Sequence, residues 1–185
     1  LEKYQVSFGE RKINKICAVG RLDDVKDYPS MFRIFKIFKE KNTNCILEVY
    51  GDGPKKNELQ QLINNEGLKD SIILKGNVAN IYSAIHDAHL FIMTSKSEAW
   101  GLALMEAMAC GIPSIAFDCD FGPREMIENY VNGIIIPNRD ENAFVQAMNE
   151  IMIDNELAEN ISNNAFRIRD KFSPNVILEN IESYI

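Results

Sequence analysis

Glu98 and Glu106 flank the stretch of this sequence best suited to binding a charged ligand. A helical rise of about 1.5 Å per residue would set them roughly 12 Å apart, comparable to the reach from a nucleotide's ribose to the far side of an attached hexose. The backbone amides near Gly101 and Leu102 would open that helix, and free N–H groups at a helix start attract diphosphates. The pattern fits a sugar–diphosphate–ribose ligand, although spacing alone favours an ordinary amphipathic helix with a surface glutamate.

Two basic residues, Arg21 and Lys26, follow Gly20 in one loop. Such a pair could clamp a diphosphate, or it could simply be solvated. A second loop contains Gly51-Asp52-Gly53-Pro54, which lacks the third glycine of the dinucleotide-binding fingerprint. We interpret this loop as a tight turn into a helix rather than as a phosphate-binding loop.

These residues need elements to position them, and short apolar runs alternate with helical patterns along the chain. The runs are continuously apolar, which is typical of strands buried on both faces of a parallel sheet. One helix presents Met31, Phe35 and Phe38 on a single face. Strands are expected at residues 16–19, 46–50, 72–74, 90–93, 114–117 and 133–136. Further helices are expected at 55–65, 81–87, 102–109, 125–128, 141–153, 156–171 and 174–184.

This alternation predicts an α/β fold: a Rossmann-like, doubly wound parallel sheet with helices on both faces and a C-terminal helical tail. Ligands of such sheets bind at the carboxyl ends of the strands, where the loops described above would lie.

The overall composition excludes several classes of protein. The chain has 185 residues, 46% of them hydrophobic, and a formal net charge of −7, which argues against nucleic acid as a partner. No apolar stretch is long enough for a membrane span, and no signal peptide is visible. The four cysteines form no metal-type pair and are interpreted as reduced, buried thiols, which predicts a cytoplasmic location.

Several short motifs occur in order along residues 20–138 and, more loosely, to the end of the chain. Together they resemble the C-terminal domain of the retaining glycosyltransferases of GT-B fold, family 4 (glycosyl transferases group 1), which includes sucrose synthases, glycogen synthases and many bacterial polysaccharide glycosyltransferases. Each motif is weak alone, but the whole series at these spacings is specific. The matching motifs are Gly20-Arg21-Leu22 with Lys26, Gly51-Asp52-Gly53-Pro54, Leu74-Lys75-Gly76, the segment from Glu98 to Glu106, Ala107-Met108-Ala109-Cys110-Gly111-Ile112-Pro113, Gly122-Pro123-Arg124-Glu125 and Asn132-Gly133.

The resemblance implies a role for each matching residue. Arg21 and Lys26 would neutralise the donor diphosphate and its departure as a leaving group. Glu98 would hold hydroxyls of the transferred sugar, and Glu106 would hold the ribose hydroxyls. Further donor contacts are implied for Gly20, Gly53, Asn77 and Val78 beside the base, and the backbone amides of Gly101 and Leu102.

The resemblance also implies an organisation and an activity. The chain would be the donor-binding half, residues 1–185, of an enzyme whose N-terminal acceptor-binding domain is absent here. It would take part in retaining transfer from a UDP-, GDP- or ADP-sugar to a saccharide or lipid-linked acceptor in polysaccharide or glycoconjugate biosynthesis. No metal or other cofactor is expected, the isolated domain would turn over little or nothing, and the full enzyme could associate peripherally with the cytoplasmic face of the membrane. The alternatives are a nucleotide-sugar-binding module without transfer activity and a nucleotide-sugar epimerase.

The sequence departs from the family pattern at two places. Asp27 follows Lys26 where glycine is usual, and Ala99-Trp100-Gly101 replaces Gly-Phe-Gly. Alanine there costs little unless the backbone needs a positive φ.

Other residues suggest a metal site only weakly. Asp118-Cys119-Asp120 resembles the Asp-x-Asp metal motif of a different glycosyltransferase fold. His86 and His89 lack partners at ligand spacing, so packing or surface roles are expected for them.

Overall fold

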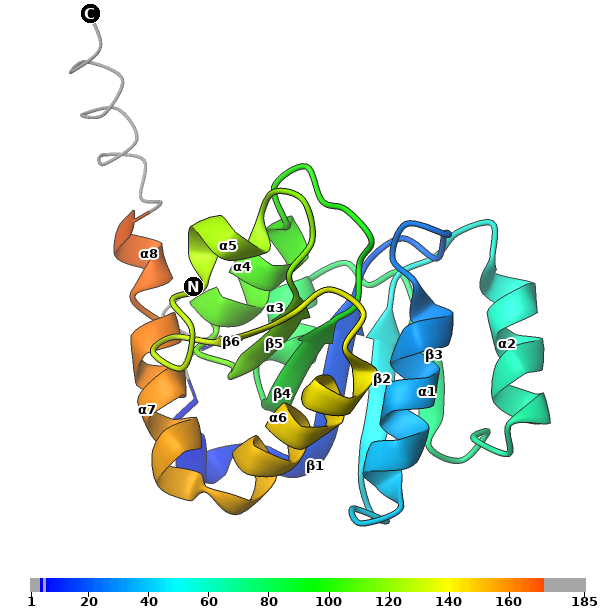
Figure 1. Ribbon diagram of the computed structural model, residues 1–185, viewed down its shortest axis with the longest axis horizontal. Helices are drawn as coiled ribbons and strands as arrows, with labels where there is room; N and C mark the ends of the chain where they lie inside the picture. The colour runs from blue at the N-terminus through cyan, green and yellow to red at the C-terminus, as the bar shows by residue number, and fades with distance from the viewer. Residues whose placement is uncertain (1–3, 5, 172–185) are drawn as a thin grey trace, which may run out of the picture.

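The computed structural model describes residue 4 and residues 6–171 of the chain. Within them, one six-stranded sheet has the order β3-β2-β1-β4-β5-β6, and every neighbouring pair of strands is parallel (Figure 1). This is the doubly wound order in which the first strand lies beside the fourth at the centre, so the predicted fold class is confirmed. The strands are β1 (Lys12–Val19), β2 (Ile46–Tyr50), β3 (Ile72–Gly76), β4 (Ala88–Met93), β5 (Ser114–Phe117) and β6 (Ile134–Ile136).

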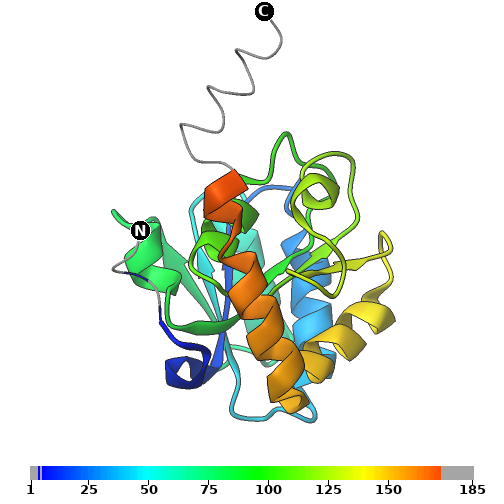
Figure 2. The same ribbon diagram turned by 90° about the vertical axis from the view of Figure 1, so that its left-hand side faces the viewer.

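Helices cover both faces of the sheet. In Figure 2, α1 and α6 lie on one side of the strands and α3 on the other. Buried side chains of α4 join those of α3 in a core cluster separate from that of α1 and α6. The helices are α1 (Tyr28–Lys39), α2 (Lys56–Asn65), α3 (Ile81–Ile85), α4 (Leu102–Ala109), α5 (Pro123–Met126), α6 (Glu141–Ile153), α7 (Asn155–Ala165) and α8 (Ile168–Lys171), with a 3₁₀ turn at Phe8–Glu10.

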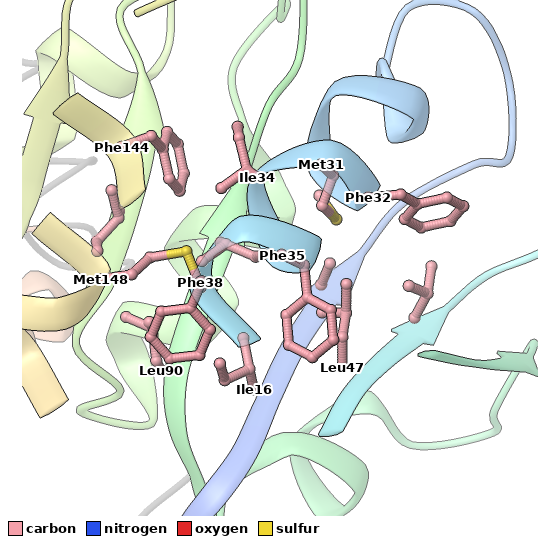
Figure 3. Packing of buried hydrophobic residues seen from close by; sticks show 14 of the residues in the cluster. Ile16, Met31, Phe32, Ile34, Phe35, Phe38, Leu47, Leu90, Phe144 and Met148 are labelled. Carbon is pink, nitrogen blue, oxygen red and sulfur yellow. The ribbon is translucent and has the colours of Figure 1, made fainter. Parts of the chain in front are cut away.

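The larger core cluster packs α1 and α6 against the sheet. Figure 3 shows Phe35 and Phe38 of α1 lying over Ile16, Leu47 and their neighbours on the strands. The predicted apolar face of α1 is confirmed, because Met31, Phe35 and Phe38 are all buried. Burial of each large side chain stabilises the fold by about 1.5–3 kcal/mol, so this packing fixes α1 on the sheet and with it the end of the loop that precedes α1.

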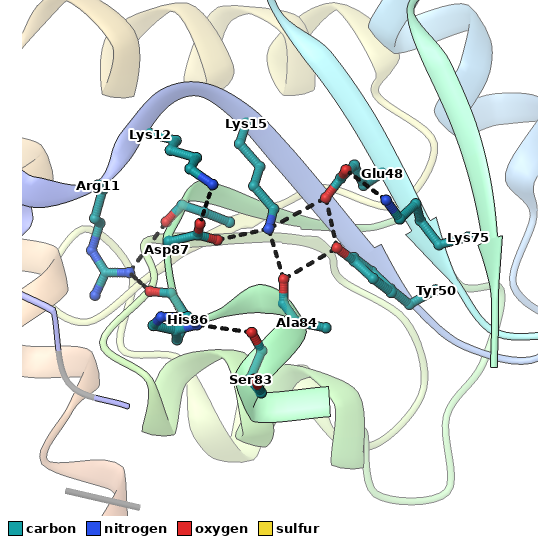
Figure 4. Close-up of polar contacts among 11 residues, drawn as sticks. Arg11, Lys12, Lys15, Glu48, Tyr50, Lys75, Ser83, Ala84, His86 and Asp87 are labelled. Carbon is teal, nitrogen blue, oxygen red and sulfur yellow. Dashed lines mark hydrogen bonds and ion pairs between the residues drawn. The ribbon is translucent and has the colours of Figure 1, made fainter. Parts of the chain in front are cut away.

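A polar network covers part of the opposite face beside the short helix α3. Lys15 Nζ lies 2.7 Å from Asp87 Oδ1 and 3.3 Å from Glu48 Oε2, and it donates a hydrogen bond to the Ala84 carbonyl (Figure 4). The Tyr50 hydroxyl donates to Glu48 Oε2 at 2.6 Å and lies 3.1 Å from the same carbonyl oxygen. β1 begins four residues before its predicted start, because Lys12 and Lys15 already pair with β4 and β2, although their charged side chains interrupt the apolar run.

The predicted helix over residues 156–171 is wrong as a single element, because the chain turns at Phe166 and Arg167 between α7 and α8. The turn lets Ile168 enter the second core cluster and lets Arg169 donate to the Ala109 carbonyl. Tertiary packing therefore overrides a helical pattern that is continuous in the sequence. The helix predicted over 174–184 lies outside the described residues.

Candidate functional site

Main-chain hydrogen bonds join the loops at the carboxyl ends of β1, β2 and β3. The Gly20 N–H donates to the Tyr50 carbonyl, and the Gly51 N–H donates to the Gly76 carbonyl, both at 2.9 Å. Gly51 has φ +136°, and a Cβ there would collide with the Gly20 carbonyl, so only glycine fits this close approach. The three loops therefore form one continuous rim.

The second loop is a tight turn, as predicted, and α2 begins just after it. Gly53 packs against the main chain of Leu22, whose N–H donates to the Asp52 carbonyl at 3.0 Å. Gly53 is not among the described residues that line the cavity of this rim, so its contact with a donor stays a prediction.

The rim surrounds a cavity of about 340 Å³, a size typical of small-molecule sites. Five predicted residues meet there, although they come from three separate segments of the sequence. Tyr50 and Ile81, which the sequence did not single out, add apolar wall. The lining consists of Val19, Gly20, Arg21, Tyr50, Gly51, Asp52, Asn77, Val78, Ile81 and Glu106.

Glu106 projects from the middle of α4 into this cavity. Burial raises the pKa of its carboxyl group. Within the described part of the chain, its carboxylate has no salt bridge and no side-chain hydrogen bond. A half-buried carboxylate without a protein donor is suited to accept hydrogen bonds from ligand hydroxyls.

Arg21 stands at the mouth of the cavity with its side chain 71% exposed. Its Nε lies 3.7 Å from Asp23 Oδ2, a loose ion pair at the surface. Such a pair contributes little to stability, so the guanidinium is available to an anionic ligand.

Lys26 and Glu98 form an ion pair that the sequence did not anticipate. The Lys26 Nζ lies 2.6 Å from Glu98 Oε1, and the two side chains are only 21% and 9% exposed. The Ser95 hydroxyl donates to the same carboxylate oxygen at 2.6 Å. A lysine ammonium has three donors, so it can hold Glu98 and still donate to a second anion.

Helix α4 begins at Leu102, so the segment from Glu98 to Trp100 is not helical. The helical rise assumed for the whole stretch, which gave about 12 Å between the two glutamates, therefore holds only from Leu102 to Glu106. Gly101 caps the helix with φ +82°, and a Cβ there would lie 2.9 Å from the Met126 methyl group. The Leu104 and Met105 N–H groups donate to the Gly101 carbonyl, which leaves those of Leu102 and Ala103 for the predicted anion site.

Two of the departures from the family pattern, at Ala99 and Asp27, have different structural consequences. Ala99 is not among the residues with positive φ, so alanine fits there without strain, as expected. Asp27 has φ +49° and lies in the left-handed region where glycine is favoured.

Two of the residues considered for a metal site contact other side chains. Asp118 forms a two-point ion pair with the Arg124 guanidinium, one of whose contacts is 2.6 Å. His89 is buried beside the Phe8 ring, and burial lowers its pKa. Among the described residues, no group of three or more His, Cys, Asp or Glu side chains is arranged to hold a metal ion.

Sequence reasoning missed the polar residues that hold this edge together. Thr94 and Ser95 directly follow β4, and polar residues just after a buried strand were a usable signal. Arg139, which bonds to Asp27, gave no signal because the two are 112 positions apart.

A second hollow of about 410 Å³ lies between α5 and the α7–α8 turn. None of the predicted site residues lines it.

All four cysteines are free and buried. None of the helices in the described residues has the length and apolar character needed to cross a bilayer.

Comparisons with known proteins place this geometry in a family context. A family model described as "Glycosyl transferases group 1" matches residues 2–168. The poly(glycerol-phosphate) alpha-glucosyltransferase of Bacillus subtilis is 29% identical over 164 residues, covering 88% of this chain and 24% of that protein. The poly(ribitol-phosphate) alpha-N-acetylglucosaminyltransferase of Staphylococcus aureus is 27% identical over 162 residues, covering 87% and 33%.

A solved structure of the pneumococcal O-GlcNAc transferase GtfA, in complex with UDP and GlcNAc, is similar with a TM-score of 0.82 and 26% identity. The match covers 98% of this chain and 37% of that one. The chain thus spans between 24% and 37% of the length of these three proteins.

Proposed function

Because the chain belongs to the glycosyl transferases group 1 family, we propose that it is the donor-binding half of a retaining glycosyltransferase of family 4 type. The proposed donor is a UDP-sugar, supported by the similarity to a structure solved with UDP. The proposed acceptor is a saccharide or lipid-linked chain of a surface polysaccharide or glycoconjugate. This is supported by two relatives whose names specify transfer of a sugar to a polymer, poly(glycerol-phosphate) in one and poly(ribitol-phosphate) in the other.

The observation that supports this proposal best is the arrangement of charge at one edge of the sheet. Glu106 and Arg21 both line the cavity, and the Lys26–Glu98 pair lies in the loops after β1 and β4, two strands that are neighbours in the sheet. A nucleoside diphosphate sugar needs an acceptor for ribose hydroxyls, cations for the diphosphate and an acceptor for sugar hydroxyls. This edge of the sheet carries a side chain of each of these chemical types.

In the proposed reaction the bond between the anomeric carbon and the diphosphate oxygen breaks, and the diphosphate leaves with the electron pair. Lys26, Arg21 and the amides at the start of α4 stabilise the negative charge that develops on the leaving group. Glu98 stabilises the positive charge that develops on the sugar. The acceptor hydroxyl then bonds to the anomeric carbon on the face that the diphosphate left, and its proton goes to the departing diphosphate.

The site needs no metal in this proposal, because arginine, lysine and backbone amides supply the positive charge. A second domain would bind the acceptor, so this chain alone would bind donor with little turnover. A cytoplasmic location, with peripheral contact of the whole enzyme with the membrane, is part of the same proposal.

The two glutamates provide the test of this assignment. Glu106→Gln is expected to weaken UDP and UDP-sugar alike, since ribose is present in both. Glu98→Gln is expected to leave UDP binding nearly unchanged and to weaken only UDP-sugars. Hydrogen bonds to a charged group contribute about 1.5–3 kcal/mol, so each loss should be on the order of tenfold to a hundredfold in Kd.

Isothermal titration of both variants against UDP, UDP-glucose and UDP-N-acetylglucosamine makes the measurement, with melting curves as the folding control. Equal losses for UDP and UDP-sugar in Glu98→Gln would contradict the assignment. A wild-type chain that binds ADP or GDP in place of UDP would correct the base, and binding of none of them would refute the function.

A further inference from the structure

Asp27 and Arg139 share an unusual backbone conformation and are bonded to each other. Their φ angles are +49° and +68°, in the left-handed region that residues other than glycine, asparagine and aspartate rarely adopt. The Arg139 Nη1 donates to Asp27 Oδ2, and the two side chains are 36% and 12% exposed. The Ser30 hydroxyl donates to the same carboxylate oxygen at 2.8 Å.

Thr94 links this ion pair to the backbone of Lys26. Its hydroxyl lies 3.1 Å from both the Lys26 and Asp27 carbonyl oxygens, and its own carbonyl accepts a hydrogen bond from Arg139 at 3.3 Å. The contacts therefore close a ring through Asp27, Arg139 and Thr94. That ring fixes the turn between the first loop and α1 to the end of β4.

The same turn sets the direction of the Lys26 side chain. The Asp23 carboxylate accepts the Lys26 N–H at 3.3 Å, while Thr94 holds its carbonyl, so both sides of the residue are anchored. From this anchor the ammonium reaches Glu98, 2.6 Å away.

We propose that the Asp27–Arg139 ion pair positions Lys26: it holds the left-handed turn that directs the ammonium toward Glu98 and the diphosphate. This inference rests on the proposed function for the diphosphate contact. Glycine at position 27 would adopt the turn without strain but would give Arg139 no partner. The chain instead carries a residue that tolerates the conformation and fastens it to the loop after β6.

The test uses Arg139→Met and Asp27→Asn, singly and combined. Asparagine tolerates the left-handed region, so Asp27→Asn removes the charge without adding backbone strain. Each single variant is expected to weaken UDP about tenfold and to leave uridine affinity unchanged, because only the diphosphate contacts Lys26. The double variant should be no worse than the weaker-binding single variant, because both changes break the same contact.

Lys36→Met is the control. It removes another ion pair of α1, in which Lys36 Nζ lies 2.7 Å from Glu66 Oε2, and neither residue contacts the Asp27–Arg139 pair. It is expected to leave UDP and uridine affinities unchanged. Loss of both ligands together in Arg139→Met, or of neither, would overturn the positioning role.

A readout without ligand separates this inference from the proposed function. The coupling between Lys26→Met and Glu98→Gln in melting temperature should shrink in the Arg139→Met background, because a misdirected ammonium pairs less well with Glu98. If the wild type bound neither UDP nor uridine, the proposed function would fail, and this coupling would still decide the inference. An undiminished coupling would refute it.

Discussion

Replacing Lys26 by methionine is expected to destabilise the protein even without ligand, because it leaves the buried Glu98 carboxylate without its charged partner. The two charged atoms are 2.6 Å apart, and the Glu98 side chain is only 9% exposed. At an effective dielectric constant of about 20, Coulomb attraction at that distance is roughly 6 kcal/mol before desolvation is subtracted. Breaking a buried pair costs about 3–5 kcal/mol, and the partial exposure of Lys26, with the remaining Ser95 hydrogen bond, reduces this to about 2–3 kcal/mol.

For a domain of this size each kcal/mol shifts the melting temperature by roughly 2–4 °C, so Lys26→Met should melt about 4–12 °C below the wild type. Urea unfolding followed by circular dichroism should give the same ranking for Lys26→Met, Glu98→Gln and the double variant. The double variant should be destabilised by less than the sum of the two single variants, since a neutral glutamine at position 98 removes the cost of burying an unpaired charge. Lys96→Met, an exposed change in the loop after β4, is the control and should shift unfolding by under about 0.5 kcal/mol. Additive effects of the two changes would refute the reasoning.

Three further predictions address pH, backbone strain and metal dependence. Burial lowers the pKa of His89, so the folded state binds fewer protons than the unfolded chain, and the free energy of unfolding should fall as pH drops below about 6.5. His89→Gln should reduce the pH dependence of the unfolding free energy, measured by urea unfolding from pH 7.5 to 5.5, and an unchanged dependence would contradict this reasoning. Phe121 is 76% exposed and has φ +61°, a conformation that glycine adopts with less strain than alanine. Phe121→Gly should therefore melt about 2–4 °C above Phe121→Ala, and equal melting temperatures would show that the residue carries no backbone strain. UDP affinity should be the same in EDTA and in Mn²⁺, and a loss in EDTA that Mn²⁺ restores would point to Asp118 and Asp120.

The fold was predictable because burial on both faces of a parallel sheet leaves a direct mark in the sequence. The strand Ile46–Tyr50 and the helix Leu102–Ala109 begin and end at the predicted residues, since an apolar run and its turn residues coincide there. The prediction failed where other forces decide the structure. β1 extends back to Lys12 through main-chain pairing with β4 although charged side chains interrupt its apolar run, and Ile168 packs into the core where the helical tail turns.

The candidate site was predictable only in its parts. Residues directly after strands, such as Arg21 and Asn77, could be assigned to one edge because parallel strands end together. The contacts between those residues could not be assigned, because they depend on side-chain directions. The pairing of Lys26 with Glu98, and of Asp27 with Arg139 across 112 positions, follows from the packed structure alone.

The hydrogen bonds between the strand-end loops have a consequence for how this site can change. They run from main chain to main chain, so they impose no side-chain identity except at a close approach such as Gly51. Arg21 and Asn77 each lie one residue beyond a glycine of these main-chain bonds, so their own side chains take no part in joining the loops. Single substitutions at the cavity-lining positions can therefore change ligand preference without unfolding the domain. Tolerance to mutation should also differ sharply between a glycine of this rim and the residue next to it.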